Sequence, residues 1–151
     1  MVLASLQLDY ADDVSTTVES DPGHAAERLL DRAVHNTTTD IPHLYAWHDR
    51  EDAVLAIRAR LATSIQTLER SRLSDGIAYN ITYNGSHAQM WATTNCRRGP
   101  DTQFGSCASI DGVAVQDRAG DTHVLAVAFD ITVTTADGYT NITTVIPIRI
   151  S

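Results

Sequence analysis

The side chains with the most distinctive chemistry in this sequence are its only two cysteines, Cys96 and Cys107, which flank a segment containing glycine and proline. A lone pair that closes such a loop is typical of a disulfide, which at this loop length contributes on the order of 3 kcal/mol to stability. The alternatives are two reduced thiols in the core, or half of a metal site. A structural zinc site requires four ligands, and the chain has no second cysteine pair. We therefore expect a disulfide.

Asparagine provides a second pattern, because four of the five asparagines open an Asn-x-Ser/Thr acceptor sequence for N-glycosylation: Asn36, Asn80, Asn84 and Asn141. Random placement of the serines and threonines would give about one such sequence among five asparagines. The alternative is that threonine-rich composition and turn chemistry produced them. Glycan acceptors and a disulfide both indicate a protein that matures outside the cytoplasm, so we expect an extracellular or cell-surface location.

The histidines offer the strongest case for catalysis or metal binding. His43 and His48 lie just before three acidic residues at 49, 51 and 52, which is the composition of a weak metal site or of an acid/base pair in a hydrolase. On a helix, however, a five-residue spacing turns the two imidazoles about 140° apart. Surface or capping roles fit better, and we expect no enzymatic activity, no cofactor and no metal.

Charge narrows the classes of partner. The chain of 151 residues has a net charge of -8, and all eleven basic residues are arginine. Nucleic acid is bound by concentrated positive charge, so we expect no nucleic-acid partner. Arg97 and Arg98, together with Phe104, lie inside the predicted disulfide loop and form the best candidate for contact with a protein partner. The alternative is an ordinary solvated turn.

Hydrophobic periodicity predicts a single α+β domain over residues 1–151, with helices first and strands after them. Residues 1–48 form a helical region, including short helices over 2–18 and 23–35, a loop over 36–40 and an apolar connector over 41–48. The longest helix is expected within 49–75, with the apolar stripe Val54, Ile57, Leu61, Ile65 and Leu68. No run reaches the roughly 20 apolar residues that span a bilayer. We interpret 2–18 as the end of a helix that continues from a removed membrane segment.

From residue 76 to 151 the period changes to two, which predicts a four- or five-stranded antiparallel sheet with the disulfide loop 96–107 inside it. Asn84-Gly85 and Asp137-Gly138 are strong two-residue hairpin signals. In these registers Ile81 lies opposite Ala88 and Val133 lies opposite Ile142, and Asn80 and Asn141 face solvent. A further strand is expected over 110–115. The apolar face of the sheet is expected to pack on the long helix.

The opening from Leu8 to Val14 (Leu-Asp-Tyr-Ala-Asp-Asp-Val), the passage from Leu73 to Thr82 and the lysine-free acidic composition resemble small secreted proteins of haloarchaeal pilus loci. The whole pattern resembles the globular part of a type IV pilin. The resemblance implies a structural subunit that assembles with other envelope or pilus subunits through a membrane-proximal N-terminal helix. Two alternatives remain open: a secreted or surface-anchored binding module that uses the 96–107 loop or the polar sheet face, and a hydrolase that uses the His43/His48 region.

Overall fold

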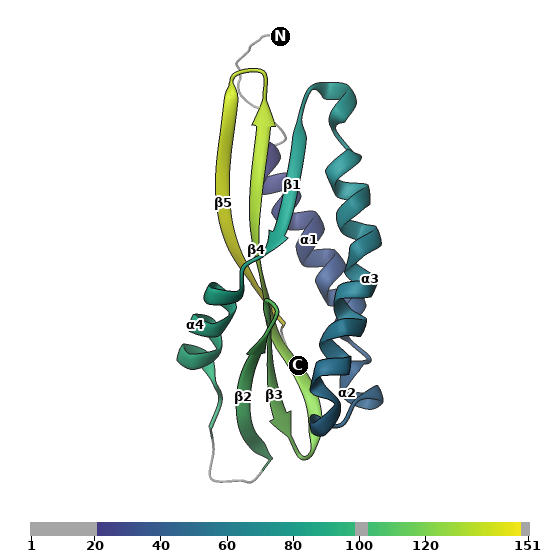
Figure 1. The fold of residues 1–151 in the computed structure, drawn as a ribbon, viewed down its shortest axis with the longest axis vertical. Coiled ribbons are helices and arrows are strands. Elements are labelled where there is room, and N and C mark those ends of the chain that lie inside the picture. The colour runs from purple at the N-terminus through teal and green to yellow at the C-terminus, as the bar shows by residue number, and fades with distance from the viewer. Residues whose placement is uncertain (1–20, 99–102, 149–151) are drawn as a thin grey trace.

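The computed structural model describes residues 21–98 and 103–148, so the helix expected over 2–18 lies outside the described residues. The fold is α+β, as predicted: two long helices pack on one face of a five-stranded antiparallel sheet (Figure 1). In chain order the elements are α1 (Pro22–Thr38), α2 (Ile41–Leu44), η2 (Trp47–Asp49), α3 (Arg50–Arg70), η3 (Leu73–Asp75), β1 (Ala78–Tyr83), α4 (Gly85–Asn95), β2 (Phe104–Ile110), β3 (Val113–Arg118), β4 (Asp121–Thr135) and β5 (Gly138–Pro147).

The long helix α3 forms as its sequence predicts. Its buried positions repeat every three or four residues and form one stripe toward the sheet: Ala53, Val54, Ile57, Leu61, Ile65 and Leu68. Gly76, at φ 77°, ends the short turn that follows the helix. Among the described residues, no helix is both long enough and apolar enough to cross a membrane.

Helix α1 extends farther than expected. Asp21 caps it by accepting a hydrogen bond from the His24 amide, and Pro22 occupies its first turn. The loop predicted over 36–40 is wrong in its first part, because the helix continues to Thr38. The buried Thr38 hydroxyl donates to the Val34 carbonyl at 2.8 Å, so a run of threonines that looks like a loop remains helical.

Strand β4 organises the sheet. Its second half pairs with β1, its first half pairs with β3, and β5 pairs along its other edge. Strand β2 adds to β3. The register of the β3–β4 ladder shifts between Ala114 and Val115, and on β4 this bulge falls around Leu125. Consequently Leu125 and Ala126 face away from α1 and α3, whereas Val124 and Val127 pack toward them.

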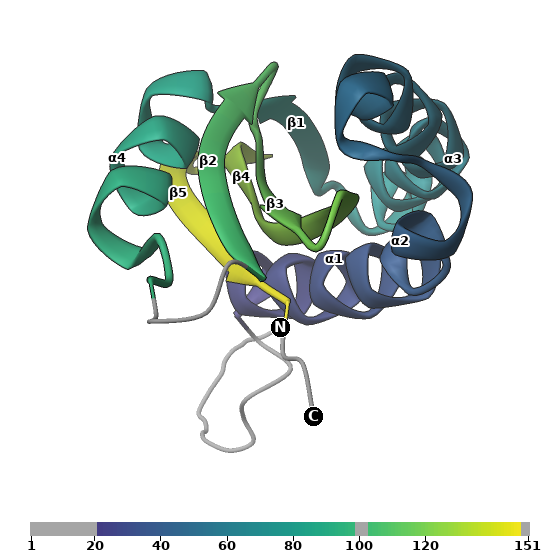
Figure 2. The ribbon, with the colours of Figure 1, turned by 90° about the horizontal axis from the view of Figure 1, so that it is seen from below.

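The predicted hairpin at Asn84-Gly85 is wrong, because these residues start a helix. The Asn84 side chain accepts the His87 amide as the N-cap of α4, and β1 pairs with β4 instead. Asparagine is favoured both in a two-residue hairpin turn and at the N-cap of a helix. The Ala, Gln and Met that follow Asn84 are good helix formers. Through Ala88 and Ala92, α4 covers part of the second sheet face, opposite α1 and α3 (Figure 2).

The predicted C-terminal hairpin forms, but its register differs by two residues. Its turn is Ala136-Asp137, so Val133 pairs with Thr140 and Ile131 pairs with Ile142. A shift of two residues keeps every side chain on its face, because side chains alternate with a period of two. The strand predicted over 110–115 forms with different bounds: Asp111 and Gly112 turn the chain after β2, and β3 runs from Val113 to Arg118.

Candidate functional site

The predicted disulfide is present. Cys96 is the C-cap of α4, Cys107 lies in β2, and the two Cα atoms are 5.9 Å apart. The bond therefore ties the end of the helix to the sheet face that the helix covers. Residues 99–102 of the intervening loop lie outside the described residues, so the description below concerns the flanking parts of the loop.

Gln116 on β3 links the loop to the sheet. It is fully buried, and its Nε2 donates to the carbonyl oxygens of Arg97, at 2.7 Å, and Gly105, at 3.1 Å. Its Oε1 accepts a hydrogen bond from Arg118 Nε at 3.0 Å. A buried amide with both ends satisfied fixes the positions of its neighbours. The sequence analysis did not single out Gln116, although a polar residue directly after the apolar run Val113–Val115 was an available signal.

Arg97 and Arg118 converge on Phe104. The guanidinium carbon of Arg97 lies 5.6 Å from the centre of the Phe104 ring, and that of Arg118 lies 5.1 Å from it, within the range of cation–π contacts. Burial, and then the nearby charge of Arg97, lowers the pKa of Arg118. Two of the three predicted contact residues are thus brought together with Arg118, which the sequence did not single out.

The third predicted contact residue, Arg98, points elsewhere. It is exposed and lines a shallow hollow beside the disulfide, together with Gln89 on α4 and Ser109 on β2. His123 also lies near Arg118, and burial and then the charge of Arg118 lower its pKa, which favours the neutral imidazole. Arg97 and Arg118 are therefore the two arginines that lie against Phe104.

Two of the predicted glycan acceptors lie in one row across the open part of the sheet. Asn80 on β1 and Asn141 on β5 both pair with Thr132 on β4, one from each side. Their acceptor hydroxyl residues, Thr82 and Thr143, flank Asp130 in the same way. Asn80 and Asn141 are exposed, as predicted, and are roughly 10 Å apart because each strand step is about 4.8 Å.

The other two acceptors differ from this pair and from each other. Asn36 is exposed on α1. Asn84 is half-buried, and its Nδ2 donates to the Asp130 carboxylate at 2.9 Å. Hydrogen bonds from Asn84, and then from Thr143, lower the pKa of Asp130. The Asn84 amide nitrogen is therefore engaged with Asp130, and Asn84 is the least exposed of the four predicted acceptors.

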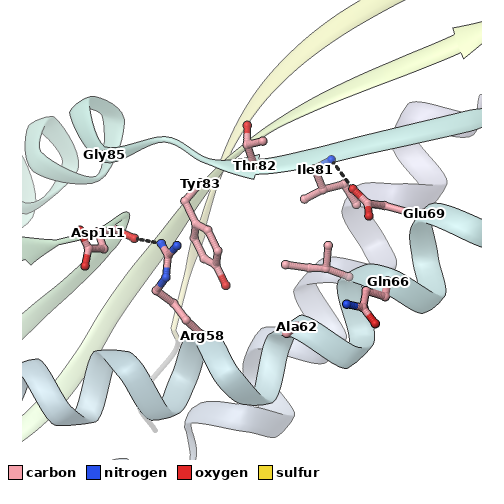
Figure 3. A pocket seen from close by; sticks show the side chains of 10 residues that line it. Arg58, Ala62, Gln66, Glu69, Ile81, Thr82, Tyr83, Gly85 and Asp111 are labelled. Atoms are coloured by element: carbon pink, nitrogen blue, oxygen red, sulfur yellow. Dashed lines mark hydrogen bonds between the residues drawn. The ribbon is translucent and has the colours of Figure 1, made fainter.

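A groove of about 680 Å³ runs between α3 and the edge strand β1 (Figure 3). At one end the Arg58 guanidinium carbon lies 4.0 Å from the centre of the Tyr83 ring, and Nη1 donates to the Asp111 carbonyl. Farther along, the Ile81 amide donates to the Glu69 carboxylate at 2.9 Å, which satisfies part of the strand edge. The Tyr83 hydroxyl is buried with no partner in the described structure.

The histidines predicted as a possible site, His43 and His48, both lie on the surface. His43 is exposed on α2, and His48 on η2 is 84% exposed, with its Nε2 3.5 Å from Asp49 Oδ2. Within residues 21–98 and 103–148, no three His, Cys, Asp or Glu side chains are placed to hold a metal ion together. The two histidines therefore occupy surface positions.

Comparison with known proteins gives one family. No curated protein and no solved structure matches the chain. The model of a family described as "Family of unknown function (DUF7261)" matches residues 1–147, nearly the whole length. The chain belongs to the DUF7261 family.

Proposed function

We propose that this protein is an extracytoplasmic, non-enzymatic structural subunit: a pilin-like or pilus-associated ectodomain that acts by assembling with other envelope proteins. The observation that carries the proposal is the Cys96–Cys107 disulfide. Structural disulfides persist in oxidising compartments outside the cytoplasm and are rare where thiols are kept reduced. The bond also has a structural role, because it fixes the loop that presents Arg97.

The acceptor asparagines support the same compartment. Asn80 and Asn141 lie on strands that flank β4, with their amides on the exposed face of the sheet. N-glycans are bulky, solubilising groups that require such a surface. Two glycans on this row would cover the polar, threonine-rich part of the sheet and leave the α1–α3 side and the Phe104 end for contacts with other subunits.

The fold adds weaker support. A long helix on an antiparallel sheet is the arrangement that the pilin resemblance implies, but a fold alone does not fix a function. The disulfide and the acceptor row therefore carry more of the argument than the architecture does.

A binding module remains the second candidate, favoured by the two arginines held around Phe104. The two candidates differ in where the protein resides. A structural subunit is expected in sheared filaments or in large envelope complexes, whereas a binding module is expected as a separate surface or secreted protein.

The test is fractionation of source cells that express the chain with a C-terminal tag, beside a Cys96→Ser/Cys107→Ser control. Proteins are alkylated under denaturing conditions, without a reducing agent, before their masses are measured. We expect the wild-type chain outside the cytoplasm with no alkylated thiol, and enriched in the filament or envelope fraction. A cytoplasmic chain with two alkylated thiols would overturn the proposal.

A further inference from the structure

The geometry points to a binding site for a carboxylate-bearing, acidic polypeptide segment, formed by Arg97, Phe104 and Arg118 and positioned by Gln116. Both guanidinium groups lie against one aromatic ring, so their carbons are no farther apart than the two ring distances combined. This inference rests on the proposed function and specifies the kind of partner that such a subunit would contact.

The two cations are held together by built structure. Arg118 belongs to β3, and its Nε is fixed by the buried Gln116 side chain. The backbone of Arg97 is fixed by the same side chain and by the adjacent disulfide at Cys96. Burial, and then the charge of Arg97, lowers the pKa of Arg118, and an arriving anion would offset the repulsion between the two cations.

Neither cation is neutralised by its surroundings in the described residues. Within 4.0 Å the described residues hold two arginine–carboxylate pairs and three histidine–carboxylate contacts, and none involves Arg97 or Arg118. The neighbouring Asp117 carboxylate instead accepts the Gly120 amide at 2.9 Å. Asp121 lies opposite Arg118 in the β3–β4 register without an ion pair. Among residues 21–98 and 103–148, Arg118 therefore makes no ion pair, and its side-chain hydrogen bond is the one from Nε to Gln116.

The ligand class follows from the shapes and charges of these groups. A guanidinium fork binds a carboxylate through two parallel hydrogen bonds, and the ring of Phe104 offers an apolar surface for the side chain that carries it. A long polyanion would extend past the site onto a protein of net charge -8 and would be repelled. A short segment carries fewer negative charges beyond the site, so it is repelled less. A second copy of the chain, with 19 Asp and Glu residues, is one source of such a segment, and another acidic protein is the other.

The inference is tested on purified, disulfide-intact protein by fluorescence anisotropy with a labelled, short polyglutamate peptide. We expect Arg118→Gln and Arg97→Gln each to weaken binding by at least about tenfold, because each removes hydrogen bonds between charged groups. Arg118→Lys keeps the charge but loses the fork, so it is expected to bind at an intermediate strength. Arg70→Gln, an exposed arginine on α3, is the matched control and is expected to bind as the wild type does. Thermal melts confirm that each variant is folded.

Two further measurements complete the test. Sedimentation of the wild type against Arg97→Gln/Arg118→Gln distinguishes the sources: loss of self-association in the double variant assigns the segment to a second copy, and unchanged monomers assign it to another acidic protein. Equal peptide binding by the wild type and the folded double variant would overturn the site. Tighter binding of dextran sulfate than of the peptide would overturn the ligand class. Neither result bears on the compartment, which the alkylation experiment tests separately.

Discussion

Two glycine turns in this sheet form a matched pair that tests the packing of β1 against the β2–β3 hairpin. Gly112 and Gly120 both have φ of 89°, and each follows a residue that also has a positive φ, Asp111 at 48° and Ala119 at 54°. Their surroundings differ. A Cβ atom on Gly112 would lie 2.7 Å from the Cβ of Tyr83, whereas a Cβ on Gly120 would meet nothing within 4 Å.

The expected costs follow from this difference. Alanine at either position adopts a left-handed conformation, which costs about 1 kcal/mol relative to glycine. At Gly112 the new atom also collides with the first side-chain atom of Tyr83, which cannot rotate away. The strand itself must shift, which adds about 1–3 kcal/mol. Gly112→Ala is therefore expected to lower the free energy of unfolding by about 2–4 kcal/mol, and Gly120→Ala by about 1 kcal/mol.

Urea denaturation followed by circular dichroism measures both values, provided that the slope of the transition is the same in the two variants. Equal destabilisation by the two substitutions would show that Gly112 does not approach Tyr83 in solution. The position of the β2–β3 hairpin against β1 would then be incorrect. The same would hold for the end of the groove where Arg58 meets Asp111.

Three other outcomes follow from single contacts. Tyr83→Phe removes a buried hydroxyl that has no partner and should be neutral or slightly stabilising, whereas Tyr79→Phe loses a 2.8 Å hydrogen bond to a backbone carbonyl and should cost about 1 kcal/mol in the same urea assay. Cys96→Ala/Cys107→Ala should cost about 3 kcal/mol, a loss that the reduced wild type should share. The pKa of Asp130 is lowered by hydrogen bonds from an amide and then from a hydroxyl, so its contribution to stability is present above the unfolded pKa of about 3.9 and is lost as pH falls through the folded value. Asp130→Asn should therefore lose less stability between neutral and acid pH than the wild type, and equal losses in a pH series of urea melts would contradict this assignment.

The sequence predicted the features that depend on one periodic pattern. The stripe of α3 and the alternation from Val127 to Val133 on β4 each specify a buried face without reference to the rest of the chain, and both form. The alternation does not extend back to Leu125, because the bulge turns this residue to the other face of the sheet. The cysteine pair was predictable for a similar reason, since only one pairing exists. For the C-terminal hairpin, the predicted turn was wrong but the predicted faces were right, because a register shift of two residues leaves each side chain on the same face.

The errors arose where one residue type serves two local structures. Asn84 begins a turn in one context and caps a helix in another, and its bond to Asp130, 46 positions away, depends on the tertiary fold. Only part of the candidate site could be predicted from the sequence, because its residues come together through the tertiary fold. Arg97 and Phe104 are close in sequence, but Arg118 and Gln116 reach them only through the β2–β3 pairing. The Asp111-Gly112 turn was the local signal that predicts that pairing.

The intact mass of the protein purified from its source, without reduction, tests the proposed function most directly. We predict a mass that exceeds that of the chain by the mass of its glycans, less two hydrogen atoms for the disulfide. Peptide mapping is expected to assign the glycans to Asn80 and Asn141 and not to Asn84. An unmodified chain with two free thiols would contradict maturation outside the cytoplasm, and the proposed assembly role would no longer have support.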